Sequence, residues 1–291
     1  MTVRKKRLFW GMIALLCIGT LCFVLLFACY ELRFALTECI ANLGFRQELQ
    51  EVEEDSLSLR QLTYDSLLTE GAVENQSLML INQDFPLPEG FEGDISEYKE
   101  SGVMMNNCVK EAYEALSEDV FQKFDEKLYI MSAFRTEEQQ RQAMSENGDT
   151  AAAVGESEHQ AGLALDVYVR YYAGKGFLKS ESGKYVNTDC WKYGFIIRYP
   201  YYGQASTGME YEPWHIRYVG SPHAEIIYRN RLTLEKYIED MEYGKFYSYG
   251  NYLITRQYPD HFLAPEVYQS VNISPDNCGG YILTFLMAGE K

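Results

Sequence analysis

An uncharged run near the start of the chain most constrains what this sequence can fold into. Residues 8–30 read LFWGMIALLCIGTLCFVLLFACY and contain no Asp, Glu, Lys or Arg. As an α-helix the run would be about 35 Å long, against about 30 Å for the hydrocarbon core of a bilayer. The run therefore predicts one N-terminal transmembrane helix.

The charges that flank the run predict its orientation. Residues 4–7 are all Lys or Arg, whereas Glu31 follows the run directly. By the positive-inside rule, residues 1–7 form a cytoplasmic tail and residues 8–30 a membrane anchor, and the rest lies outside the cell. We therefore expect a single-pass protein of the cell membrane whose main domain is extracellular.

Two other readings of the run remain open. A cleaved signal peptide has a shorter apolar stretch and a small-residue cleavage site. A lipoprotein signal needs small residues ahead of a cysteine, and residues 26–29, LFAC, approximate that motif poorly because Phe27 is bulky. The sequence favours the uncleaved anchor.

The charge balance argues against a nucleic-acid partner. The chain has a net charge of −16, and four of its 26 Lys and Arg residues lie at residues 4–7, so the remainder is more acidic still. Such a surface repels phosphate backbones.

The patterns after the run divide the chain into three further segments. Residues 31–77 begin with a Glu-, Leu-, Gln- and Arg-rich stretch at helical spacing, which predicts an extracellular stalk or, alternatively, a first helix packed on the domain. Residues 78–243 alternate short apolar strands with amphipathic helices, as expected for the main α+β domain. Residues 244–291 carry short Tyr-rich alternating runs, which predict a small β appendage.

Within the main domain, apolar alternation and helical spacing predict individual elements. The expected strands are at residues 78–82, 129–132, 163–169, 194–198 and 215–219, and the expected helices are at residues 107–125, 136–144 and 222–241.

Three residues have the types of a zinc site made of two histidines and one carboxylate: His159, Asp166 and His215. Zinc held by three protein ligands keeps one position open and lowers the pKa of a bound water to about 7. Glu212 lies three residues before His215, where it can act as a general base. A single histidine is more often structural than a ligand, so the prediction rests on the combination.

The other histidines lack such a setting. We interpret His223 as the N-terminal residue of a helix after Pro222, and His261 as a surface residue.

Pro213 predicts how Glu212 and His215 come together. Positions three apart on a straight strand face opposite sides of the sheet. A bend at Pro213 would let both side chains face one ion.

Four sequence blocks resemble the VanY-type D-alanyl-D-alanine carboxypeptidases. Residues 157–166, SEHQAGLALD, match their SxHxxGxAxD motif, and residues 212–215, EPWH, are similar to their ExWH block. Residues 132–136, SAFRT, followed by Gln140, resemble their SxYRS…Q segment, and residues 191–200 resemble the strand between the two metal motifs. The resemblance covers about residues 78–234.

The resemblance implies a fold and a role for eight residues. The fold would be a small α+β domain of the hedgehog or DD-peptidase type, with a central antiparallel sheet and helices packed on it. One Zn²⁺ would be bound by His159, Asp166 and His215, and Glu212 would be the general base and then the acid. Arg135 would be catalytic as well as substrate-binding, because it would face the substrate's terminal carboxylate and polarise the scissile carbonyl. Further substrate contacts would come from Gln140, Ser157 and Trp214.

The function implied is a membrane-anchored zinc D,D-carboxypeptidase, a metal-dependent counterpart of the serine-type D-Ala-D-Ala carboxypeptidases. Its partners would be the cytoplasmic membrane and a peptidoglycan stem peptide or its precursor, from which it removes the terminal D-Ala. Related enzymes contribute to glycopeptide resistance, so the same contribution is an expectation here. The alternatives are an L,D-carboxypeptidase acting on tetrapeptide stems, and a catalytically silent wall-binding domain.

Overall fold

The computed structural model describes residues 3–28, 30–41, 44, 46, 47, 49–148 and 151–288. The chain forms two compact units, Met1–Phe45 and Arg46–Lys291.

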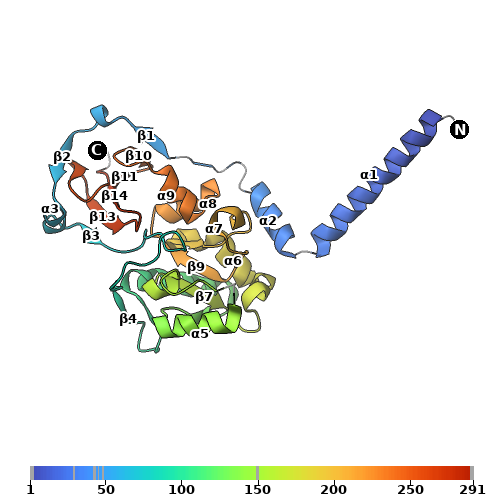
Figure 1. Cartoon of the computed structure of the whole chain (residues 1–291), viewed down its shortest axis with the longest axis horizontal. Coiled ribbons are helices and arrows are strands. Elements are labelled where there is room, and N and C mark those ends of the chain that lie inside the picture. The colour runs from blue at the N-terminus through green and yellow to red at the C-terminus, as the bar shows by residue number, and fades with distance from the viewer. Residues whose placement is uncertain are drawn as a thin grey trace. The chain divides into compact units, whose positions relative to one another are not determined.

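The first unit consists of two helices, α1 (Val3–Ala28) and α2 (Tyr30–Ala41) (Figure 1). In the part of the chain that the structure describes, no helix combines the length and apolar character needed to cross a membrane. The predicted transmembrane helix at residues 8–30 is therefore wrong. Of the described residues in the run, those up to Ala28 belong to α1 and Tyr30 begins α2, whose first turn carries Glu31.

A four-stranded antiparallel sheet forms the centre of the second unit. Its strand order is β6-β7-β9-β8, with β6 at Tyr129–Ser132, β7 at Ala164–Tyr168, β8 at Phe195–Ile197 and β9 at His215–Tyr218. Because side chains alternate across a strand, Leu165 and Val167 of β7 enter the core while Asp166 faces the other way. Asp166 lies opposite His215 in the register of β7 and β9.

Helices pack around this sheet, so the mixed α/β part of the fold prediction is confirmed. The α-helices are α4 (Lys110–Phe124), α5 (Glu137–Asn147), α6 (Glu181–Asp189), α7 (Gln204–Thr207), α8 (His223–Asn230) and α9 (Leu234–Asp240). The 3₁₀ helices are η2 (Asn107–Val109), η4 (Glu158–Ala161), η5 (Gly174–Lys179) and η6 (Cys190–Tyr193). Leu116 and Val120 of α4 pack in the same core as Leu165.

The predicted helix at residues 222–241 is two helices. Arg231 adopts a left-handed conformation with φ of 54° and ends α8, and Thr233 then caps the start of α9. A helix cannot continue through a residue in that conformation.

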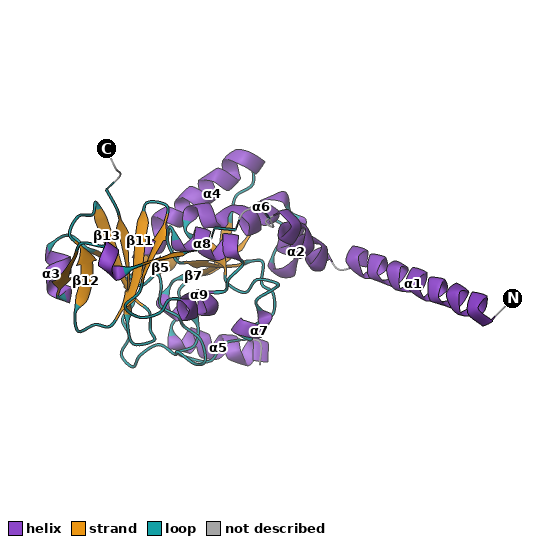
Figure 2. Ribbon diagram, turned by 90° about the horizontal axis from the view of Figure 1, so that it is seen from above, coloured by secondary structure: helices purple, strands orange, loops and turns teal. Residues whose placement is uncertain are grey.

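Strands from the beginning and from the end of this unit pair with each other and form a second layer (Figures 1 and 2). A six-stranded sheet has the order β1-β10-β11-β14-β13-β3, and two pairs are separate from it, β12-β2 and β4-β5. The bounds are β1 Gln50–Val52, β2 Leu59–Leu62, β3 Val73–Glu74, β4 Ile95–Glu97, β5 Met104–Asn106, β10 Phe246–Tyr249, β11 Tyr252–Gln257, β12 Phe262–Pro265, β13 Ser270–Pro275 and β14 Tyr281–Leu286, with η1 at Glu54–Ser56 and α3 at Tyr64–Thr69.

This layer differs from the predicted stalk and appendage. Residues 50–74 pair with the strands of residues 246–286 instead of standing apart from them. Leu67 of α3 is fully buried in one cluster with Phe246 and Phe262. The reason is that a small sheet left alone exposes its edges and its apolar face, and the earlier segment covers both.

Within the segment at residues 78–82, the four apolar residues 78–81 are buried, but no strand in the described part of the chain pairs with it. Its backbone is held by other groups. Leu78 N donates to Ser274 Oγ at 3.0 Å, Leu80 N donates to Asp276 O at 3.0 Å, and Arg217 Nη2 donates to Met79 O at 2.9 Å. The strand prediction is therefore wrong, although the burial that its composition indicates is present.

Candidate active site

Three side chains from separate elements meet at one end of the central sheet. His159 lies in η4, Asp166 on β7 and His215 on β9. Each is at most 6% exposed, and one ligand atom of each lies within 4.8 Å of the others. Residues directly opposite on antiparallel strands have adjacent side chains, which explains why Asp166 and His215 meet.

The atoms of this cluster suit a metal ion. Among the described residues, His159 Nε2 and Asp166 Oδ1 are buried without a hydrogen-bond partner. Leaving a buried polar atom unpaired costs about 1–3 kcal/mol, which a bound cation would offset. The Nδ1–H of His159 donates to the carbonyl of Ala133 at 2.7 Å, so its Nε2 lone pair is free to bind a metal. Two imidazoles and a carboxylate are one of the ligand sets that hold catalytic zinc.

The charges of the cluster are strongly coupled. Burial opposes ionisation of Asp166, but interactions with His159 and His215 outweigh it and hold the pKa of Asp166 well below its usual range. Burial lowers the pKa of His159. Although burial also opposes charge on His215, its interactions with Asp166 and Glu158 raise the pKa of His215 to about 9. A metal ion therefore competes with a proton at this site.

Glu212 lies beside the cluster. Its Oε2 is 3.4 Å from Nδ1 of His215, and its side chain is 21% exposed. The backbone turns at Pro213, where His215 N donates to Glu212 O at 3.1 Å, so the predicted bend is present. Asn187 Nδ2 donates to Pro213 O at 2.8 Å and holds the turn. Burial raises the pKa of Glu212.

Arg135 follows the end of β6, whose Ser132 lies opposite Asp166 in the register of β6 and β7. Its Nη2 donates to Asp166 Oδ2 at 3.0 Å, and its Nε donates to Ser132 Oγ at 2.8 Å. Its Nη1 donates to Gln140 Oε1 at 3.3 Å, and Gln140 Nε2 donates to Ala152 O at 2.7 Å. Gln140 is thus placed to orient Arg135.

The two remaining predicted site residues have less distinct settings. Ser157 is buried immediately before η4, where its carbonyl accepts from Gln160 N at 3.0 Å. Trp214 is partly buried against the core of the central sheet. Its carbonyl accepts from Val167 N at 2.9 Å, which ties the turn after Glu212 to β7.

One charged residue of the site was missed by sequence reasoning. Glu158 is 2% exposed, and its Oε2 lies 3.9 Å from His215 Nε2. Burial opposes its charge, but Arg198 and Arg217 outweigh that effect and hold the pKa of Glu158 well below its usual range. The available signal was an acidic residue directly beside the predicted ligand His159.

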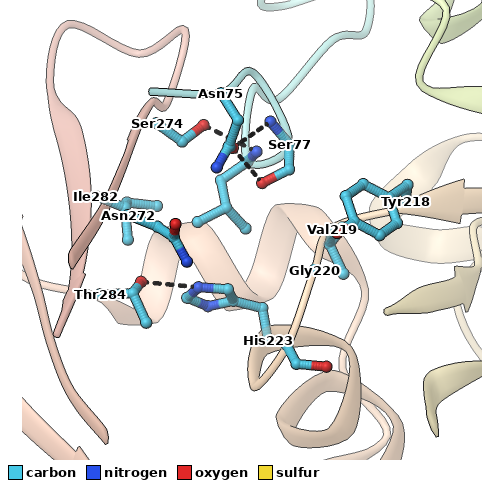
Figure 3. A pocket seen from close by; sticks show the side chains of 12 residues that line it. Asn75, Ser77, Tyr218, Val219, Gly220, His223, Asn272, Ser274, Ile282 and Thr284 are labelled. Atoms are coloured by element: carbon cyan, nitrogen blue, oxygen red, sulfur yellow. Dashed lines mark hydrogen bonds between the residues drawn. The ribbon is translucent and has the colours of Figure 1, made fainter. Parts of the chain in front are cut away.

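The other two histidines do not join the cluster. His223 begins α8 after Pro222 and borders a small polar cavity of about 60 Å³ between α8 and strands β13 and β14 (Figure 3). Its Nδ1 lies 2.6 Å from Tyr237 Oη and its Nε2 lies 2.9 Å from Thr284 Oγ1. Burial lowers the pKa of His223 to about 3. His261 is exposed.

This chain is similar to known carboxypeptidases. The family model of VanY, D-alanyl-D-alanine carboxypeptidase, matches residues 102–221. A D-alanyl-D-alanine carboxypeptidase from Enterococcus faecium is 32% identical over 248 residues, which cover 76% of this chain and 79% of that protein.

Two solved structures are also similar. A mutant of the vancomycin resistance D,D-pentapeptidase VanY from a VanB-type resistance cassette, in complex with Zn(II), is 29% identical with a TM-score of 0.51, over 56% of this chain and 98% of that chain. The LD-carboxypeptidase LdcB is 30% identical with a TM-score of 0.51, over 68% of this chain and 99% of that one.

The similarity extends over most of the E. faecium protein, and residues 102–221 contain every residue of the cluster described above. This chain therefore belongs to the VanY family of D-alanyl-D-alanine carboxypeptidases.

Proposed function

We propose that this carboxypeptidase binds one Zn²⁺ per chain and hydrolyses the terminal D-Ala of peptidoglycan stem peptides. The observation that carries the proposal is the convergence of His159, Asp166 and His215, with buried atoms that lack partners among the described residues. The similar VanY structure holds Zn(II), which supports the choice of metal. When bound, the ion supplies Lewis acidity and lowers the pKa of a water molecule to about 7.

Glu212 is proposed to move the proton. Its Oε2 faces the metal-binding cluster and can accept a proton from the attacking water. The same oxygen then returns the proton to the leaving amine of D-Ala. The raised pKa of Glu212 favours this transfer, because a base works best when its pKa approaches the working pH.

Arg135 is proposed to recognise the free carboxylate at the end of the substrate. A guanidinium is planar and binds a carboxylate with two parallel hydrogen bonds. Ser132 and Gln140 fix the orientation of Arg135, and Asp166 accepts a hydrogen bond from it. Recognition of a chain end explains why the enzyme acts as a carboxypeptidase.

An L,D-carboxypeptidase is the second candidate, because LdcB is as similar to this chain as the VanY structure is. Mass spectrometry of defined stem peptides separates the two. Loss of one D-Ala from the pentapeptide but not from the tetrapeptide supports D,D specificity, and the reverse pattern supports the alternative.

Metal analysis combined with pentapeptide digestion tests the proposal as a whole. We expect one zinc per chain and hydrolysis that chelation abolishes and zinc restores. A chain that binds no zinc, or that remains fully active after chelation, would contradict the proposal. A chain that binds wall peptides without cleaving them would support the alternative of a catalytically silent wall-binding domain.

We further propose that the reaction takes place outside the cell and contributes to glycopeptide resistance, because it removes the D-Ala-D-Ala terminus. Expression in a susceptible strain should raise the inhibitory concentration of vancomycin, whereas a Glu212→Ala variant should not.

A further inference from the structure

We propose that Glu158 is a positioning residue for His215: its carboxylate accepts the Nε2–H of the imidazole and so turns Nδ1 toward the metal. The inference rests on the zinc site proposed above. It gives a role to Glu158, to which the family resemblance assigned none. Three observations carry it: the orientation of the ring, the way Glu158 is held, and its link to distant segments.

The orientation of His215 separates its two nitrogens. Nδ1 lies 3.1 Å from Asp166 Oδ1 and 3.4 Å from Glu212 Oε2, so it faces the metal cluster. Nε2 faces Glu158 Oε2 at 3.9 Å, and both atoms are buried without a hydrogen-bond partner in the described part of the chain. A neutral imidazole has one donor and one acceptor nitrogen. With Nδ1 binding the metal, the hydrogen lies on Nε2, and a shift of about 1 Å closes its hydrogen bond to Glu158.

The carboxylate of Glu158 is held so that only one oxygen faces His215. Its Oε1 accepts from Arg198 Nε at 2.6 Å and lies 3.5 Å from Arg217 Nη1. The side chains of Glu158 and both arginines are at most 1% exposed. Two buried cations keep the buried carboxylate ionised, since an isolated buried charge would be too costly. An ionised acceptor makes a stronger hydrogen bond than a neutral one.

Both arginines are themselves fixed by segments far from the metal cluster. Arg198 donates to both carboxylate oxygens of Glu235 on α9, at 2.9 and 2.5 Å. Arg217 Nη2 donates to the carbonyls of Ser77 and Met79, at 3.0 and 2.9 Å. His159 has a similar support, because its own second nitrogen donates to Ala133 O. Both histidine ligands then have their rings fixed through the nitrogen that does not bind the metal.

The first test uses the wild-type, zinc-loaded full chain. The chain has four histidines, so ¹⁵N-histidine labelling gives an interpretable NMR spectrum. We expect the ring of His215 to carry its proton on Nε2, protected from exchange, with Nδ1 bound to the metal. A His215 ring that binds the metal through Nε2 would overturn the proposal, and this test needs no variant to fold.

The second test compares Glu158→Gln with Glu235→Gln as a matched control. Both variants remove one carboxylate charge that pairs with Arg198, but only Glu158 faces His215. We expect Glu158→Gln to weaken zinc binding about 10- to 100-fold in a chelator competition, as outer-shell variants do. Glu235→Gln should keep the zinc affinity of the wild type even where it lowers the melting temperature.

The outcomes separate this inference from the proposed function. A wild type that binds no zinc would refute the zinc enzyme itself. A wild type that binds zinc, with Glu158→Gln binding it equally well, would refute only the positioning role. Equal losses of affinity in both variants would mean that the network acts through general stability, which also contradicts the proposal. At saturating zinc, a lowered kcat with unchanged KM in Glu158→Gln would support it.

Discussion

At the scale of single residues, the roles proposed for metal binding and for proton transfer fall on side chains of different exposure. His159, Asp166 and His215 are nearly fully buried, whereas the side chain of Glu212 is 21% exposed at the edge of the cluster. A partly exposed carboxylate can reach both a water molecule and a leaving amine. The two roles can therefore be tested independently of each other.

Replacing Glu212 should stop turnover without removing the metal. Glu212→Ala leaves the three predicted ligands in place, so we expect normal zinc content and a kcat lower by about 10²- to 10⁴-fold. Pentapeptide hydrolysis and metal analysis of the same sample measure both. Glu210→Ala is the matched control, because it also removes a nearby glutamate but one that is exposed and pairs with Lys175. Wild-type turnover in Glu212→Ala would refute the assignment of the base.

Replacing Arg135 should remove the preference for a free chain end. Arg135→Lys keeps the charge but loses the planar pair of donors, so kcat/KM for the free peptide should fall about 10- to 100-fold. The wild type should discriminate strongly against a C-terminally amidated peptide, and the variant should discriminate less. Arg141→Lys, on the exposed face of α5, is the control. Equal activity of the wild type on amidated and free peptides would contradict this role.

The candidate site residues could be singled out from the sequence because short segments carry them, and the fold brings three of them together. Asp166 follows His159 by seven positions and the turn at Pro213 joins Glu212 to His215, so local sequence reports their chemistry. The role of Glu158 could not be predicted in the same way. It depends on arginines 40 and 59 positions away, whose approach only the folded sheet determines.

At the scale of elements, patterns that are satisfied locally were predicted well. The strand at residues 129–132 is β6, and Thr136 caps α5 through a capping box, as its sequence indicates. Residues 50–74 were not recognised as strands. Their partners lie about 200 positions later in the chain, and short edge strands carry little periodic signal of their own.

The turn between β13 and β14 should be essential to the stability of the strand layer. Asp276 is fully buried and accepts from Arg256 Nε at 2.7 Å, Tyr243 Oη at 3.0 Å and Gly280 N at 2.9 Å. Asp276→Ala leaves Arg256 buried without its carboxylate, so the free energy of unfolding should fall by about 3–5 kcal/mol.

Urea denaturation of the full chain measures this loss. Asn272→Ala is the control, because Asn272 lies exposed on β13, the strand before the turn, and it should change the free energy of unfolding by at most about 0.5 kcal/mol. Equal losses in the two variants would show that the turn has no special part in holding the layer.

At the scale of the whole second unit, the strand layer and the central sheet share their supports. Asn277 Nδ2 in the turn after β13 donates to the carbonyls of Leu80 and Phe85, at 2.9 and 3.0 Å. Arg217 of β9 binds the carbonyls of Ser77 and Met79 in the same segment. The segment that begins the main domain is therefore held from both sides. We infer that the layer supports the sheet that carries the site.

His223 makes the contact between α8 and the strand layer sensitive to acid. It lies beside the cavity between α8 and the strand layer, where it contacts Thr284 (Figure 3). Its other ring nitrogen contacts Tyr237. Its pKa is about 3 in the folded chain against 6.5 for an unperturbed histidine, so the unfolded chain binds its proton first as the pH falls. Its contribution is fully present above about pH 6.5 and is lost progressively toward pH 3. Between pH 7 and pH 5 the loss should be about 2 kcal/mol.

Measuring the free energy of unfolding at pH 7 and pH 5 isolates this effect. Other titrating groups contribute equally to the wild type and the variants. The relevant quantity is therefore how much more free energy of unfolding the wild type loses between pH 7 and pH 5 than the variant does. His223→Gln should be less stable than the wild type at pH 7, because Gln does not reproduce both ring contacts, but it should lose less stability on acidification. His261→Gln, at an exposed position, should keep the wild-type pH dependence. If His223→Gln and the wild type lose the same free energy of unfolding between the two pH values, His223 does not make the contact between α8 and the strand layer sensitive to acid.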